Sequence, residues 1–74
     1  MFNKVAEIIA EQLGIDVSEI TPESSLTDDL KADSIDVVAL VMDLESQYGI
    51  VVEDEDLVKL KTVGDIVAFI EAKQ

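Results

Sequence analysis

The stretch SIDVVALVMDLESQY, residues 34–48, carries the strongest helical pattern in the chain, and the rest of the fold must pack around it. As a helix it is about 22 Å long at 1.5 Å per residue, and Gly49 follows it as a stop signal. One set of its apolar residues falls within an arc of roughly 100°, which is enough to face the core of a helical bundle. This core-facing set comprises Val37, Leu40, Val41, Leu44 and Tyr48.

A second apolar stripe runs along the same helix. Ile35, Val38 and Met42 recur at i, i+3 and i+7, and Glu45 continues the line. A helix that is buried nearly all round would explain this surplus. An exposed strip that docks a partner would explain it too, because its apolar side chains would make the contact while flanking carboxylates attract lysine and arginine. The sequence leaves both interpretations open.

The start of this helix offers two candidate caps. In DSID, residues 33–36, Asp33 can cap the helix while Asp36 fills the box position, which leaves the Ser34 hydroxyl free. A nucleophilic serine needs a nearby base, and the chain has no histidine, so direct catalysis by Ser34 is disfavoured. A phosphate on Ser34 would be stabilised by the backbone N–H groups at the helix N-terminus. Modification of Ser34 by another enzyme is therefore the chemical alternative to a plain cap.

The flanking segments predict the remaining elements. Helical periodicity covers residues 2–13, a short acidic helix is indicated from Asp54 to about Leu60, and a last helix follows the capping pair Thr62 and Asp65. Residues 15–33 contain turn formers, which predicts a long ordered loop with one or two short helical turns, one of them at residues 21–24. We expect the apolar residues of this loop to pin it to the core: Ile15, Val17, Ile20, Leu26 and Leu30. Residues 50–52 have strand propensity but no evident partner, which predicts an extended connection. We predict an all-α fold: a small antiparallel bundle of three main helices plus one short helix, as a single domain over residues 1–74.

Composition narrows the function. The chain has no cysteine and no histidine, so thiolate metal sites and the usual general base near neutral pH are absent. Seventeen acidic residues against five basic ones give a net charge of −12, which repels nucleic acid and anionic membranes and attracts basic protein surfaces. With no signal peptide and no long apolar run, we expect a soluble intracellular protein whose partners are proteins with basic patches.

The segment DDLKADSIDVVALVMDLE, residues 28–45, resembles the attachment-site segment of acyl carrier proteins, and the resemblance extends over essentially all 74 residues. It includes the loop with Leu26 and Leu30, the Asp-Ser motif, the acidic short helix and the final helix TVGDIVAFI. The resemblance implies that Ser34 is esterified with 4′-phosphopantetheine by a separate phosphopantetheinyl transferase. The chain is then a non-catalytic carrier, and the arm supplies the thiol that a chain without cysteine lacks.

By the same resemblance, the chain holds growing acyl chains as thioesters and delivers them to separate enzymes of fatty-acid synthesis, as a cytoplasmic monomer. The residues that meet basic docking patches on these enzymes would be Asp33, Ile35, Asp36, Val38, Met42 and Glu45. We also expect apolar space between the second helix and the short third helix to shelter an acyl chain, lined by Leu44, Leu57 and Leu60. Two features depart from the family pattern: Ile35 replaces the usual leucine after the serine, and Ala39 and Ser46 stand where acids are common.

Three alternatives stay open at this point. Within the same class, the cargo could belong to a polyketide, amino-acid or specialised lipid pathway. In another class, the chain would be an unmodified acidic helical interaction module in which Ser34 only caps. A calcium site in EDED, residues 53–56, is poorly supported, because a 12-residue loop from Asp54 would put Lys59 where glycine is needed and Asp65 in place of the bidentate glutamate.

Overall fold

A computed structural model describes residues 1–73; Gln74, the last residue of the predicted domain, lies outside the described residues. The elements are α1 (Phe2–Leu13), the 3₁₀-helix η1 (Val17–Glu19), α2 (Ser34–Tyr48), α3 (Asp54–Leu57) and α4 (Val63–Lys73). Within residues 1–73 the only β-type pairing is one isolated bridge between Ser25 and Thr62. The predicted all-α bundle of three main helices and one short helix is confirmed.

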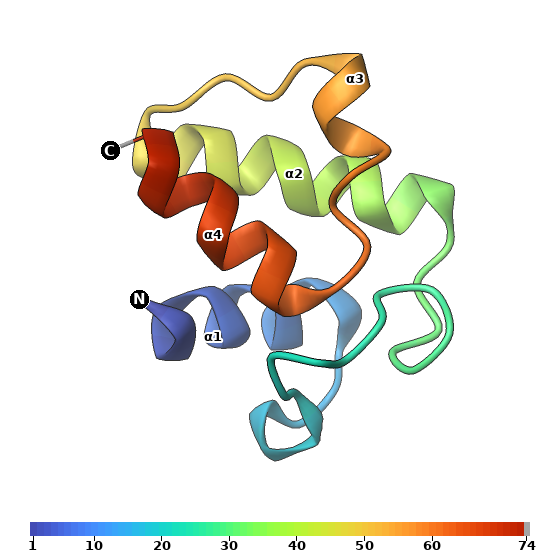
Figure 1. Ribbon diagram of the computed structural model, residues 1–74. Coiled ribbons are helices and arrows are strands. Elements are labelled where there is room, and N and C mark those ends of the chain that lie inside the picture. Colours follow the sequence, from blue (N-terminus) through green and yellow to red (C-terminus); the bar gives the residue numbers. More distant parts are fainter. Residues whose placement is uncertain (74) are drawn as a thin grey trace.

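The three long helices enclose the core (Figure 1). α2 and α4 both run opposite to α1, and α3 lies across α2 on the side away from α1. α1 contacts both α2 and α4, so it closes the bundle from below in this view. The central side chains are fully buried, and the periodicity of each helix places them there: Val5, Ile9, Leu40, Val63, Ile66 and Ile70.

Local signals end the long helices where the sequence predicts. Gly14 and Gly49 adopt left-handed conformations, with φ of 68° and 64°, which a glycine reaches without a Cβ penalty. At the start of α4, the Thr62 hydroxyl accepts from the Asp65 N–H at 3.1 Å and the Asp65 carboxylate accepts from the Thr62 N–H at 3.1 Å. This reciprocal pair is the predicted capping box with aspartate in place of glutamate.

The long loop contains one helical turn, but not at residues 21–24. The turn is η1, where Asp16 caps by accepting from the Ser18 N–H at 3.0 Å. Hydrogen bonds from the Ser18 backbone and side chain hold the pKa of the Asp16 carboxyl below its usual range. Because this pKa is lowered on folding, the cap stabilises the fold at neutral pH and is lost as the pH falls through the folded-state pKa.

Residues 21–24 form a tight turn, where a helical turn was predicted. The Ser24 N–H donates to the Thr21 carbonyl at 3.0 Å, and the Thr21 N–H donates to the Ser24 hydroxyl at 3.0 Å. Pro22 therefore occupies a turn position, which its fixed φ suits as well as the first position of a helix. The prediction of a helical turn was wrong because a threonine or serine side chain bonds to nearby backbone N–H groups in tight turns and in helix caps alike, so the residue pattern does not distinguish them.

The loop is clamped to the start of α4 by backbone hydrogen bonds. The Gly64 N–H donates to the Pro22 carbonyl at 2.8 Å, the Val63 N–H to the Ser24 carbonyl at 3.1 Å, and the Leu26 N–H to the Lys61 carbonyl at 3.0 Å. Three apolar residues of the loop, Ile20, Leu26 and Leu30, are buried as predicted. Val17, expected among them, is 44% exposed, because η1 turns it outward. The clamp fixes one end of the loop beside the segment that follows α3.

α3 is shorter than predicted, ending at Leu57 and not near Leu60. The chain continues through 3₁₀-type bonds, from the Lys59 N–H to the Asp56 carbonyl at 2.9 Å and from the Leu60 N–H to the Leu57 carbonyl at 3.2 Å. No residue of α3 is buried, so this helix is held by its ends and by half-buried Leu57. Residues 50–52, predicted as an extended connection, form no helix or strand and lead through Glu53 into α3.

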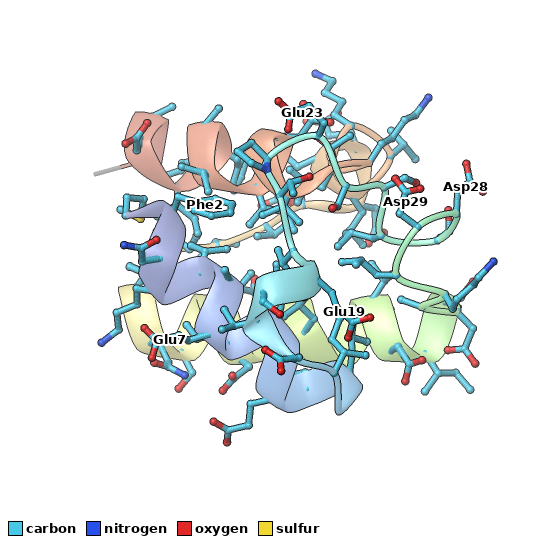
Figure 2. The ribbon with its side chains drawn as sticks, turned by 90° about the horizontal axis from the view of Figure 1, so that it is seen from below. Phe2, Glu7, Glu19, Glu23, Asp28 and Asp29 are labelled. Atoms are coloured by element: carbon cyan, nitrogen blue, oxygen red, sulfur yellow. The ribbon has the colours of Figure 1, made fainter. Side chains whose placement is uncertain are left out.

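Acidic side chains project outward from the surface formed by α1 and the loop. Figure 2 shows Glu7, Glu23 and Asp28 at the outer surface, whereas Phe2 packs inward between α1 and α4. The carboxylates of Glu19 and Asp29 turn back to accept from the N–H groups of Asp16 and Ser25. Among residues 1–73, no cation lies within 4.0 Å of a carboxylate. The carboxylates of the described part are therefore not neutralised by ion pairs within it.

Candidate functional site

The Ser34 side chain is exposed at the first position of α2 and has no capping role. The Asp33 carboxylate caps the helix by accepting from the Asp36 N–H at 2.9 Å, and the Asp36 carboxylate accepts in return from the Asp33 N–H at 3.3 Å. This is the predicted capping box. Within residues 1–73 the Ser34 hydroxyl makes no hydrogen bond, so its oxygen is accessible for chemistry.

The backbone around Ser34 is suited to a phosphate ester. The N–H groups of Ser34 and Ile35 open a helix of 15 residues and have no acceptor among the described residues. N–H groups at a helix N-terminus stabilise an attached anion directly and through the helix dipole. The two capping carboxylates are turned to backbone donors by the box, which limits their repulsion of that anion. The site therefore fits a phosphodiester on Ser34.

The second apolar stripe of α2 is solvent-exposed. The exposed fraction is 79% for Ile35, 48% for Val38 and 62% for Met42, and we call these three residues the apolar strip. Together with Ser34 and Ala39 they line one shallow groove along α2. Burial of α2 nearly all round, the first interpretation of this stripe, is thus excluded. The core-facing set behaves as predicted: Leu40, Val41 and Leu44 are buried, while Val37 and Tyr48 are half-buried.

The carboxylates expected at a docking surface differ in the hydrogen bonds that they already make within the chain. Asp33 is exposed and Asp36 is half-buried beside Ser34, and each uses one carboxylate oxygen in the capping box. Glu45 is half-buried, and its Oε2 accepts from the Val52 N–H at 2.7 Å. Glu45 is therefore tied to the segment that leads into α3, a contact that the helical pattern did not predict.

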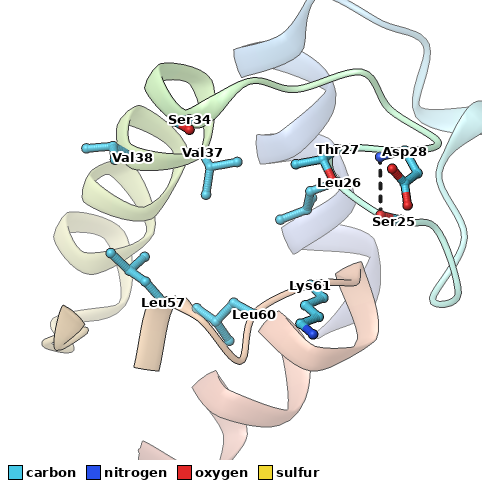
Figure 3. A pocket seen from close by; sticks show the side chains of 10 residues that line it. All are labelled: Ser25, Leu26, Thr27, Asp28, Ser34, Val37, Val38, Leu57, Leu60 and Lys61. Atoms are coloured by element: carbon cyan, nitrogen blue, oxygen red, sulfur yellow. Dashed lines mark hydrogen bonds between the residues drawn. The ribbon is translucent and has the colours of Figure 1, made fainter. Parts of the chain in front are cut away.

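A hollow of about 440 Å³ opens beside Ser34 (Figure 3). Side chains of Val37 on α2, Leu26 on the loop, and Leu57 and Leu60 in the α3 segment point toward one another across it. The rest of its lining is Ser34, Val38, Ser25, Thr27, Asp28 and Lys61. The hollow is bounded by three separate segments, with Ser34 at the α2 end.

Leu57 and Leu60 line the hollow as expected, but Leu44 does not. The Leu44 side chain is only 2% exposed and packs in the core among the three long helices. The loop wall, residues 25–28, was not anticipated from the sequence. Its one signal was Leu26, an apolar residue among turn formers, which had been assigned only to pinning the loop.

The described residues offer no metal centre and no membrane span. No group of three or more potential metal-ligating side chains converges within residues 1–73, and EDED forms the N-cap and first turn of α3. No helix in this part of the chain is long and apolar enough to cross a membrane.

Comparisons with known proteins agree with the site. The family described as "Phosphopantetheine attachment site" matches residues 3–70. An acyl carrier protein from Thermotoga maritima is 58% identical over 73 residues, covering 99% of this chain and 90% of the relative. One from an Exiguobacterium species is 61% identical over 69 residues, covering 93% and 87%. The solved structure of an acyl carrier protein from Enterococcus faecalis superposes with a TM-score of 0.83 at 38% identity, covering 99% of this chain and 92% of that one.

Proposed function

The chain belongs to the acyl carrier protein family, whose prosthetic group is covalently attached 4′-phosphopantetheine, and we propose that it holds growing acyl chains on this group at Ser34 and delivers them to the separate enzymes of fatty-acid synthesis. Fatty-acid synthesis is the typical role of proteins with this name. One observation carries the proposal: the free Ser34 hydroxyl lies where the apolar strip and the hollow meet.

Ser34 contributes the attachment atom. Its Oγ attacks the phosphorus that carries pantetheine in a nucleotide pyrophosphate donor and gives up its proton to a base of the phosphopantetheinyl transferase, since this chain has no histidine. The phosphorus–oxygen bond to the donor's nucleotide part breaks, and the nucleotide leaves with the second phosphate. The N–H groups of Ser34 and Ile35 then face the phosphodiester that results. When bound, the group supplies a flexible arm with a terminal thiol, which holds an acyl chain as a thioester. The tether raises the effective concentration of the acyl chain at each enzyme's active site.

Docking is assigned to the surface of α2 next to the attachment point. The contact residues in this proposal are Asp33, Ile35, Asp36, Val38, Met42 and Glu45. The apolar strip supplies exposed area, and the Met42 side chain adapts to different partner surfaces. Charge complementarity between the acidic chain and basic partner patches speeds encounter and keeps the complexes short-lived. The proposal includes a cytoplasmic location, shared with the enzymes served, and action as a single domain and a monomer.

The hollow is proposed as the shelter of the acyl chain. It begins at Ser34, and the side chains that face one another across it are apolar. Burial of each methylene of an acyl chain there would contribute about 0.8 kcal/mol. α3 itself contributes no buried residue to the wall that Leu57 and Leu60 form, so Leu60 is the wall residue that also belongs to the core.

The assignment of Ser34 is tested by intact-mass measurement. Incubation of the chain with a phosphopantetheinyl transferase and its donor should add one phosphopantetheine to the wild type and none to Ser34→Ala. Ser46→Ala, which removes an exposed hydroxyl from the same helix, is the matched control and should be modified fully. Addition to Ser34→Ala, or none to the wild type, would contradict the proposal.

The shelter is tested by comparing amide spectra of the thiol and octanoyl forms. Octanoylation should shift the amide signals of Leu26, Val37, Leu57 and Leu60, because the acyl chain would contact these side chains in the hollow. Amide signals of α1 should not shift, since no residue of α1 lines the hollow. Identical spectra for the two forms would show that the acyl chain stays in solvent.

A further inference from the structure

The end of α2 is organised around Glu45. The Glu45 carbonyl accepts from the Gly49 N–H and from the Ile50 N–H, the latter at 3.2 Å. Its side chain then reaches forward, and Oε2 accepts from the Val52 N–H at 2.7 Å in a half-buried position. The same residue therefore closes the helix through its backbone and holds the following segment through its carboxylate.

That segment has few other polar attachments, and its apolar contacts to the core are made by buried Leu60 and half-buried Val52. The backbone bonds of residues 53–60 are internal, joining Asp56 and Leu57 to Glu53, Lys59 to Asp56, and Leu60 to Leu57. α3 contributes no buried residue to the core. A charge-assisted hydrogen bond at the entrance to such a segment is among the strongest single contacts that the segment has.

The segment also forms a wall of the hollow, through Leu57 and Leu60. Val52 precedes α3 by only two residues, so release of its N–H frees the N-terminal end of that wall. We propose that Glu45 is the positioning residue of the hollow: its carboxylate holds the α3 wall in place through the Val52 N–H. The functional role of this contact rests on the proposed shelter of the acyl chain, but the contact itself can be tested without an acyl chain.

The same carboxylate continues the line of the apolar strip, and its second oxygen remains for a cation. A lysine or arginine that pairs with Glu45 therefore acts on the group that holds the wall. Glu45 thus belongs to the proposed docking surface and also holds the segment that forms a wall of the hollow, which connects the two physically.

The test measures backbone amide exchange with solvent by NMR, using the whole chain without its prosthetic group. Glu45→Ala removes the acceptor and should speed exchange at Val52 and at the hydrogen-bonded amides of the following segment by about ten- to a hundredfold, the range expected for loss of a charge-assisted bond. These amides are those of Asp56, Leu57, Lys59 and Leu60. Buried amides of α1 and α4 should be unchanged. Glu45→Gln keeps an acceptor oxygen without the charge, so its exchange should fall between wild type and Glu45→Ala.

Asp43→Asn is the matched control. It removes one carboxylate from the same helix, but the Asp43 side chain accepts from the Gln47 amide at 3.2 Å and not from the segment after α2. Its exchange should match the wild type. Equal acceleration by Asp43→Asn, unchanged exchange at Val52 in Glu45→Ala, or equal rates in Glu45→Ala and Glu45→Gln would overturn the proposal. Because the measurement needs no modification of Ser34, failure to attach the prosthetic group leaves its result intact.

Discussion

Replacing Leu26 by alanine should lower the free energy of unfolding by about 3 kcal/mol, although Leu26 lies in a loop. The Leu26 side chain is 1% exposed and belongs to the same cluster as the core residues of the long helices. Its truncation leaves a cavity that the clamped backbone cannot close, since the Leu26 N–H is bonded to the Lys61 carbonyl. A 74-residue chain has roughly 4 to 11 kcal/mol of stability in all, so the loss is a large fraction.

Urea denaturation followed by circular dichroism measures this change. Val17→Ala is the matched control, because it shortens an exposed apolar side chain of the same connection, and it should change the stability by less than about 0.5 kcal/mol. A loss for Leu26→Ala as small as that of Val17→Ala would mean that the loop packs independently of the core. The prediction also bears on function, because Leu26 lines the hollow.

The helices were predictable because their signals are local. Asp33 and Asp36 are three residues apart and satisfy each other's backbone N–H groups, and Gly49 ends α2 through a bond to the carbonyl four residues earlier. Such contacts depend on spacing that is visible in the sequence. The exposure of the apolar strip was one of two interpretations of a clear pattern, and only the packing of the other helices decided between them.

The loop and the hollow were less predictable because they depend on contacts between distant segments. Turn formers such as Pro22 and Ser24 indicate a bend but do not encode its partner, which is the start of α4 about forty positions later. Leu44 and Leu57 look alike in the sequence, yet one faces the core and the other the hollow. The Glu45 contact spans seven residues across a helix end, where helical periodicity no longer applies.

Replacing Gly64 by alanine should destabilise the chain by about 1–3 kcal/mol, the cost of overpacking a close contact. A Cβ at this position would stand 2.9 Å from the Pro22 carbonyl oxygen, closer than side-chain carbons normally approach. The carbonyl cannot turn away easily, because it accepts from the Gly64 N–H at 2.8 Å. Either the clamp bond lengthens or the turn at Pro22 moves.

The expected loss of stability in Gly64→Ala is opposite to what helix propensity predicts. In an open helix, exchange of glycine for alanine stabilises by about 1 kcal/mol, so helix propensity alone predicts the opposite result. Ala68→Gly, at an exposed position of the same helix, measures that propensity term and should cost about 1 kcal/mol. If Gly64→Ala proves more stable than the wild type in urea, the clamp yields without cost. If it is less stable, and the amide signals of Ser24 and Leu26 shift as well, then the close contact between the loop and α4 fixes the position of the loop residues that line the hollow.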